Sequence, residues 1–136
     1  MPEENVELVR RFIDAFSRRD RETFAALLHP EVEWDSFVTP LLGIAETMHG
    51  RDELVRVTFE RIPQVLDDWH AVPLEVEALA DGQVLSVARY EARGSSSGAE
   101  ITMETTAIYR FDSGVIVHVR EFRTREEAVE AAGLSE

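Results

Sequence analysis

The stretch from residue 69 to residue 123 most constrains the fold, because it alternates apolar and polar side chains in four segments separated by glycine-containing turns. Alternation with a period of two predicts strands that bury one face, and tight turns between them predict antiparallel hairpins. We therefore expect a mostly antiparallel sheet built from consecutive strands. The expected strands cover residues 69–80, 83–93, 99–111 and 115–123.

The first half of the chain carries helical patterns instead. Apolar side chains recur every three to four residues in three segments, which predicts amphipathic helices, with Asn5 and Asp20 as N-caps of the first two. We expect Pro30 to end the second helix and Pro63 to end or kink the third near its last turn. The expected helices cover residues 5–18, 21–28 and 51–66.

The remaining segments complete the order of elements. Residues 32–36 alternate and predict a first strand, whereas residues 37–50 show no clear period and predict a loop of the length that often forms a lid. Residues 125–132 predict a short closing helix with Gly133 as its C-cap. Helices gathered at the start of the chain must cover one face of the sheet, so the sequence predicts an α+β fold.

The composition fits one domain that spans residues 1–136 and limits its partners. The chain has 27 acidic and 14 basic side chains and a net charge of −13, which disfavours nucleic acid and anionic membranes as partners. It has no cysteine, so disulfides and thiolate sites are excluded. The N-terminus shows no signal-peptide pattern, and no apolar run approaches the ~20 residues of a membrane span, so we expect a cytoplasmic protein.

Strand parity predicts which side chains share the covered face of the sheet. The odd positions of 99–111 and the even positions of 83–93 are the more apolar sets, and the second choice turns Tyr90 inward. If the odd positions of 115–123 also face inward, Glu121 is a carboxylate among valines. Burial of that kind raises a carboxyl pKa toward the range that suits proton transfer.

Five segments carry a family resemblance, namely Glu7–Asp20, Ala26–Trp34, His49–Leu54, Gly114–Val117 and Arg125–Leu134. Together they resemble the SnoaL-like branch of the nuclear-transport-factor-2-like superfamily, over nearly the whole chain. The resemblance implies a cone-shaped domain with a small-molecule pocket between a curved sheet and its helices, and a homodimer formed through the outer sheet face. Members include polyketide cyclases, ketosteroid isomerase, limonene epoxide hydrolase and non-catalytic domains, so the fold alone does not imply one function.

Two enzymes of that superfamily allow a comparison at single positions. Ketosteroid isomerase has a tyrosine acid and an aspartate base where this chain has Phe12 and Ser36, which argues against steroid isomerisation. The final-strand aspartate of limonene epoxide hydrolase matches Glu121, but its second aspartate and its arginine fall at Tyr90 and Ala88. Glu121 also suits the acidic acid/base group on which SnoaL-type cyclases rely.

The candidate catalytic residues are Glu121 as proton carrier and Tyr90 or His49 as the group that polarises a carbonyl oxygen. Each also has a purely structural interpretation: an ion pair for Glu121, an ordinary strand aromatic for Tyr90 and a helix-ordering loop residue for His49. The histidines lack metal-ligand spacing and no nucleotide motif is present, so we expect neither a metal nor a cofactor. The candidate pocket residues are Phe12, Phe16, Trp34, Ser36, Phe59, Ile62, Met103, Thr105 and Val119.

Three functions remain open from the sequence. The first is a cofactor-free isomerase, cyclase or lyase that acts on a small apolar carbonyl compound. The second is a non-catalytic binding module for a small apolar molecule, and the third is a dimerisation domain without a ligand. The carboxylate of Glu121 ranks the enzyme first.

Overall fold

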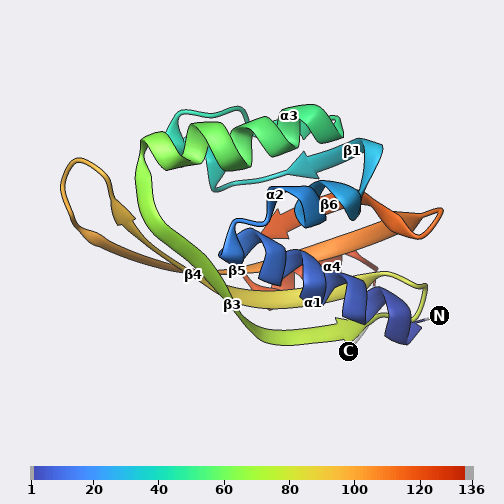
Figure 1. The fold of residues 1–136 in the computed structure, drawn as a ribbon. Coiled ribbons are helices and arrows are strands. Elements are labelled where there is room, and N and C mark those ends of the chain that lie inside the picture. The colour runs from blue at the N-terminus through green and yellow to red at the C-terminus, as the bar shows by residue number, and fades with distance from the viewer. Residues whose placement is uncertain (1, 134–136) are drawn as a thin grey trace.

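The structure is a computed structural model that describes residues 2–133. It contains an open six-stranded sheet in the order β2-β1-β6-β5-β4-β3, in which β1 and β6 are parallel and all other neighbours antiparallel (Figure 1). The predicted α+β fold with a mostly antiparallel sheet is confirmed. The strands are β1 (Leu28–Asp35), β2 (Thr47–His49), β3 (Leu66–Ala78), β4 (Val84–Gly94), β5 (Glu100–Asp112) and β6 (Val115–Phe122).

Helices cover both faces of this sheet, and they do so unequally. Helix α1 packs across β3 and β4, and α2 and α3 lie over β1 on the same, concave face, whereas α4 packs on β5 and β6 from the other side (Figure 1). The α-helices are α1 (Pro2–Arg18), α2 (Arg21–Ala26), α3 (Arg51–Arg56) and α4 (Arg125–Ala131). Short helical turns are η1 (Thr39–Leu42), η2 (Val57–Arg61) and η3 (Ile62–Gln64).

The two faces bury separate apolar clusters. The larger one fills the space between the concave face and its helices, and Val9, Phe24 and Val84 within it are at most 1 % exposed. The smaller one joins α4 to the outer face. Val84 and Leu85 belong to opposite clusters, which confirms the predicted alternation of β4.

Strand β6 departs from simple alternation at its start. A register shift in its pairing with β5 lets Ile116 and Val119 both join the inner cluster. A bulge of this kind reverses parity, because one extra residue on one strand changes which side chains point inward. The predicted inward set of odd positions therefore applies to Val119 and Glu121 but not to the first residues of the strand.

The predicted N-cap of the first helix is wrong, whereas that of the second is confirmed. Helix α1 begins at Pro2, so Asn5 lies within the helix, and its side-chain amide donates to the Gly82 carbonyl at 3.2 Å. Asp20 caps α2, because its Oδ1 accepts the amide hydrogen of Thr23 at 3.1 Å.

Proline positions explain two other differences from the predicted boundaries. Pro30 does not end α2; it lies inside β1, where pairing with β6 is interrupted between Leu28 and Glu33. An interrupted ladder accommodates a residue that has no amide hydrogen. Residues 51–66 are not one helix, because α3 passes into the π-helical turn η2 and then η3, which contains Pro63.

The segment predicted as a loop at 37–50 contains the turn η1 and the short edge strand β2. Strand β2 pairs with β1 and follows the same alternation, with Met48 buried and His49 exposed. This strand decides where His49 lies, as described below.

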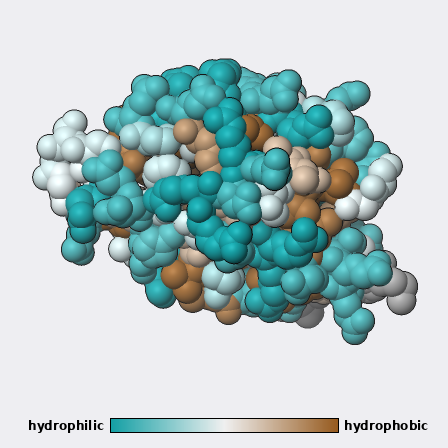
Figure 2. All heavy atoms as spheres, viewed as in Figure 1, coloured by the Kyte–Doolittle hydropathy of each residue, from teal (hydrophilic) through white to brown (hydrophobic). Residues whose placement is uncertain are grey.

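Figure 2 shows a largely hydrophilic face with hydrophobic side chains gathered in smaller areas between hydrophilic ones. Within residues 2–133, no helix has the length and apolar character that crossing a membrane requires.

Candidate functional site

A cavity of about 310 Å³ lies between the concave face of the sheet and the helices that cover it. Its walls are mostly apolar and come from α1, η1, the α3–η3 segment and strands β1, β3, β4, β5 and β6. A volume of this size and an apolar lining are typical of small-molecule sites in proteins. A few polar groups interrupt the wall, and Ser36, Tyr90 and Tyr109 among them interact with Glu121.

Glu121 projects from β6 into this cavity beside Ser36, the residue that follows β1. The Ser36 hydroxyl donates to Glu121 Oε1 with an oxygen–oxygen distance of 2.5 Å. The two residues meet because β1 lies parallel to β6, with Trp34 opposite Val119 and Asp35 opposite Arg120. Parallel pairing of the first and last strands thus brings together residues 85 positions apart.

Burial dominates the electrostatics of Glu121. It raises the pKa of the carboxyl from 4.5 to about 7, although hydrogen bonds from the side chains of Ser36 and Trp34 act in the opposite direction. The residue keeps part of its surface accessible, and it lines the cavity. A carboxyl group with this pKa exists in both protonation states near neutral pH, so it can accept a proton and return it.

Ser36 is held by the backbone of the following turn. Its Oγ accepts the amide hydrogens of Val38 at 3.0 Å and Thr39 at 3.2 Å. Those two bonds occupy the acceptor sites of the hydroxyl, so its one hydrogen is directed to Glu121. Ser36 is therefore a fixed donor, and Glu121 Oε1 is a fixed acceptor.

Two tyrosines line the cavity close enough to Glu121 for its charge to affect them. Burial, followed by the negative charge of Glu121, raises the pKa of Tyr90 well above its usual value, and burial is also the main cause of the raised pKa of Tyr109. Both phenols therefore keep their hydrogen at neutral pH. The Ser86 hydroxyl donates to the Tyr109 oxygen at 3.1 Å, and the Thr105 side chain forms a hydrogen bond with Tyr90. Each of these bonds lowers the pKa of its tyrosine, but burial has the larger effect.

Aromatic rings form much of the apolar wall. Phe12 of α1 stacks on Phe24 with ring centroids 4.5 Å apart and lies 5.8 Å from Trp34. Phe16 meets Tyr90 edge to face at 5.7 Å. Such contacts fix the orientation of the rings and of the Tyr90 hydroxyl.

A second carboxylate, Glu91, is also on the cavity lining but in a different environment. It bonds to Arg89 Nε at 2.7 Å and to His70 Nε2 at 2.8 Å. The bond from Arg89, followed by that from His70, lowers the pKa of Glu91. Glu91 is therefore ionised at neutral pH, whereas Glu121 is partly protonated. The difference between their pKa values suits Glu121 to carry a proton and Glu91 to remain a fixed negative charge.

The structure brings most of the candidate residues together. Glu121, Tyr90, Phe12, Phe16, Trp34, Ser36, Ile62 and Met103 all line the cavity.

Four candidates lie elsewhere. Val119 is fully buried in the core. Thr105 is 2 % exposed, and its side chain forms a hydrogen bond with Tyr90. Phe59 packs edge to face on Phe24 with centroids 5.1 Å apart, away from the cavity lining. His49 does not polarise anything in the cavity, because its side chain is 71 % exposed on the outer face, with Nδ1 3.5 Å from Glu33 Oε1.

Tyr109 is a site residue that the sequence analysis did not single out. Its parity on the strand 99–111 already placed it on the inner face, so alternation was the signal that could have identified it. Thr39 and Leu42 of η1 also line the cavity, and no periodic signal in residues 37–50 indicated them.

Comparisons with known proteins agree with this architecture. A family model described as a SnoaL-like domain matches residues 9–119. No curated protein matches the chain significantly.

Three solved structures illustrate the likeness. TerC, co-crystallised with polyporic acid, is 21 % identical with a TM-score of 0.76, covering 93 % of this chain and 96 % of TerC. A protein of unknown function from Burkholderia pseudomallei, described as NTF2-like, is 24 % identical with a TM-score of 0.75, covering 93 % and 95 %. A Jannaschia protein provisionally described as a SnoaL-like polyketide cyclase is 18 % identical with a TM-score of 0.74, covering 96 % and 92 %.

Structures with identities this low show that the fold is shared, and they carry no information on activity. The family match extends over most of the chain, and the fold is the one that the sequence resemblance implied. The protein therefore belongs to the SnoaL-like domain family, with a nuclear-transport-factor-2-like fold.

Proposed function

We propose that the protein is a cofactor-free acid/base catalyst that moves a proton on a small apolar carbonyl compound bound in the cavity. The observation that carries this proposal is the Glu121 carboxyl on the wall of an apolar cavity, with its pKa raised to about 7 and one oxygen held by Ser36. A group of this kind is matched to proton transfer at neutral pH.

The proposed step balances without a cofactor. The Glu121 carboxylate removes a proton from the carbon next to the carbonyl, and the electron pair moves onto the carbonyl oxygen. The proton on the carboxyl exchanges with water, and the carboxyl then returns a proton to the same carbon or to a different atom of the substrate; return to a different atom gives an isomer. Atoms and charge are conserved over the cycle, and Glu121 is restored.

The tyrosines supply the second part of the proposed chemistry. Tyr90 and Tyr109 keep their hydroxyl hydrogens because their pKa values are raised. Each phenol oxygen accepts a hydrogen bond from the wall side, so its own hydrogen is available to the developing enolate oxygen. Donors that are oriented before reaction, in a site of low polarity, stabilise such charge effectively.

The substrate class follows from the walls. Phe12, Phe16 and Trp34 favour an apolar, partly aromatic molecule, and the carboxylates disfavour an anionic one. Polyporic acid, with which TerC was co-crystallised, is one ligand to test for comparison.

The direct test is exchange of carbon-bound hydrogen. Purified protein is incubated in D₂O with a panel of enolisable apolar ketones, beginning with 2-tetralone, and deuterium incorporation is followed by NMR. We expect exchange above the buffer rate, and its loss in Glu121→Gln. The matched control is Glu104→Gln, which changes an exposed glutamate of β5 and should exchange like the wild type. Equal exchange by wild type and Glu121→Gln would contradict the proposal.

A non-catalytic binding role is the second candidate, and the same cavity supports it. Binding stabilises a protein by RT ln(1 + [L]/Kd), so a ligand raises the thermal midpoint whether or not it reacts. Stabilisation by a ketone in both wild type and Glu121→Gln, without exchange in either, would favour the binding module over the enzyme.

A further inference from the structure

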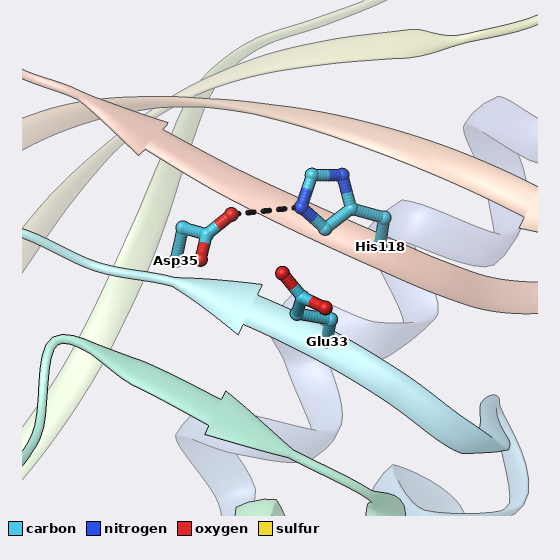
Figure 3. Close-up of side chains that lie close together, drawn as sticks. All are labelled: Glu33, Asp35 and His118. Carbon is cyan, nitrogen blue, oxygen red and sulfur yellow. Dashed lines mark hydrogen bonds and ion pairs between the residues drawn. The ribbon is translucent and has the colours of Figure 1, made fainter.

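A second group of chemically reactive side chains lies on the outer face of the sheet, away from the cavity. Glu33 and Asp35 of β1 and His118 of β6 point toward one another (Figure 3). One ligand atom of each can be chosen so that all lie within 4.8 Å of one another. The three side chains are partly buried.

A fourth side chain, His49, lies next to this group through strand pairing. Glu33 of β1 pairs with His118 of β6 on one side and with His49 of β2 on the other. His49 Nδ1 is 3.5 Å from Glu33 Oε1, and His118 Nε2 is 2.9 Å from Asp35 Oδ2. On the outer face, His49 therefore lies beside Glu33, and His118 lies beside Glu33 and bonds to Asp35.

The group also has a positioning residue. Thr47 of β2 donates its hydroxyl to Asp35 Oδ1 at 2.8 Å, which leaves Oδ2 directed to His118. Fixed carboxylates of this kind are typical of the residues around metal ligands. Arg120 of β6 lies opposite Asp35. Burial raises the pKa of that carboxyl, but hydrogen bonds with His118 and Thr47, followed by nearby charge that includes Arg120, lower it overall. The guanidinium carbon of Arg120 is 5.0 Å from the centre of the Phe122 ring.

We propose that Glu33, Asp35 and His118 bind one first-row divalent transition-metal ion such as Zn²⁺, with water as the fourth ligand. Imidazole nitrogen and carboxylate oxygen bind zinc at about 2.0–2.2 Å, which separates neighbouring tetrahedral ligands by about 3.4 Å. The Asp35–His118 separation is 2.9 Å and the three ligand atoms all lie within 4.8 Å of one another, so small side-chain rotations would give that spacing. The imidazole of His118 disfavours Ca²⁺ and Mg²⁺, which prefer oxygen ligands.

The sequence analysis expected no metal, because it considered histidine spacing along the chain. That criterion does not cover side chains that strand pairing brings together. Asp35 and His118 are 83 residues apart and become neighbours through the parallel pairing of β1 and β6.

The proposed metal site is separate from the proposed catalytic site, although both use residues of or next to β1 and β6. Residues alternate across the sheet, so Trp34 and Ser36 face the cavity while Glu33 and Asp35 face outward. A metal at the outer face would link β1 and β6 on the opposite side of the sheet from the Ser36–Glu121 contact. It should therefore stabilise the fold without entering the cavity.

The test uses the full chain after removal of metals by a chelator. Zn²⁺ is titrated calorimetrically into wild type, His118→Ala and Asp35→Asn. The matched control is His29→Gln, because His29 lies elsewhere on β1, with Nε2 3.8 Å from Asp112. We expect one Zn²⁺ per wild-type chain, unchanged binding by the control and an affinity lowered roughly tenfold or more in both cluster variants.

A second measurement requires no variant. Zn²⁺ added to wild-type protein should shift the imidazole NMR signals of His118 and leave those of His29 and His70 unchanged. The proposal is overturned if wild type shows no saturable binding, if the cluster variants bind like wild type, or if Zn²⁺ shifts His29 or His70 instead.

Discussion

The Ser36 hydroxyl and the Glu121 carboxyl form a bond whose direction is fixed. Ser36 Oγ accepts amide hydrogens from Val38 and Thr39 and lies 2.5 Å from Glu121 Oε1, so it donates to that oxygen in both protonation states of the glutamate. A proton that Glu121 takes up must consequently reside on Oε2. The Ser36–Glu121 bond thus selects the oxygen that takes part in proton transfer.

Replacing Ser36 should raise the pKa of Glu121 further. Ser36→Ala removes a hydrogen bond to the charged form, and bonds of that type contribute about 1.5–3 kcal/mol, or roughly one to two pKa units. The acidic limb of the pH–rate profile should move to higher pH by that amount. Ser36→Thr keeps the hydroxyl and should restore the wild-type profile. A profile that is the same for the alanine variant and wild type would show that the bond does not control the carboxyl.

Glu121 should make the protein less stable as pH rises. Its pKa is about 7 in the folded state against 4.5 as the reference value, so the folded state binds more protons between those values. The contribution of Glu121 to the free energy of unfolding is therefore fully present below pH 4.5. It is lost as pH rises through about 7, which lowers the free energy of unfolding by at most about 3 kcal/mol.

Glu121→Gln removes this penalty, so the variant should be more stable than wild type at pH 8 and nearly equal at pH 4.5. Urea unfolding at the two pH values measures the difference. Glu104→Gln, an exposed change of the same kind, should show no such pH dependence. If Glu121→Gln were less stable than wild type at pH 8, the carboxyl would be stabilised by partners rather than strained by burial.

Tyr90→Phe should slow hydrogen exchange while leaving the fold intact. The ring and its edge-to-face contact with Phe16 remain, and the hydroxyl donor is lost. Loss of one donor to a developing oxyanion lowers kcat by roughly a hundredfold or more, with little change in KM. Met103→Leu changes the same wall without a polar group and should stay near wild-type kcat. Equal kcat values for the two variants would remove Tyr90 from the proposed chemistry.

Local patterns predicted much of the inner face of the sheet. Alternation is a property of neighbouring residues, so it turned Tyr90 inward before any strand order was known, whereas for Glu121 it left both faces of the strand open. The contact between Ser36 and Glu121 depends instead on β1 pairing with β6, which no local pattern determines. His49 shows the same limit, because residues 47–49 gave no periodic signal and yet form an edge strand that turns this side chain outward.

Partners of the outer face were likewise inaccessible to local patterns. Ile108 and Phe122 face outward, and helix α4 covers them through Ala128 and Val129. The homodimer that we expected through this face stays a prediction, and its interface would have to use the surface that α4 leaves uncovered. Sedimentation at increasing protein concentration measures the association directly.

The aromatic wall should be a structural requirement of the cavity. Phe24 is 1 % exposed, stacks on Phe12 at 4.5 Å and meets Phe59 at 5.1 Å, so Phe24→Ala removes packing from both sides of the ring. Deletion of a buried phenylalanine side chain costs about 3–5 kcal/mol, which urea unfolding would measure.

The control for Phe24→Ala is a change at the rim of the same cavity. Leu41 also lines the cavity but is 69 % exposed, so Leu41→Ala should change the free energy of unfolding by less than about 0.5 kcal/mol. A small cost for Phe24→Ala, similar to that of Leu41→Ala, would mean that the helices collapse onto the sheet when the ring is removed. The cavity would then be a loosely filled core rather than a preformed site, and the dimerisation-domain hypothesis would gain weight over both ligand-binding functions.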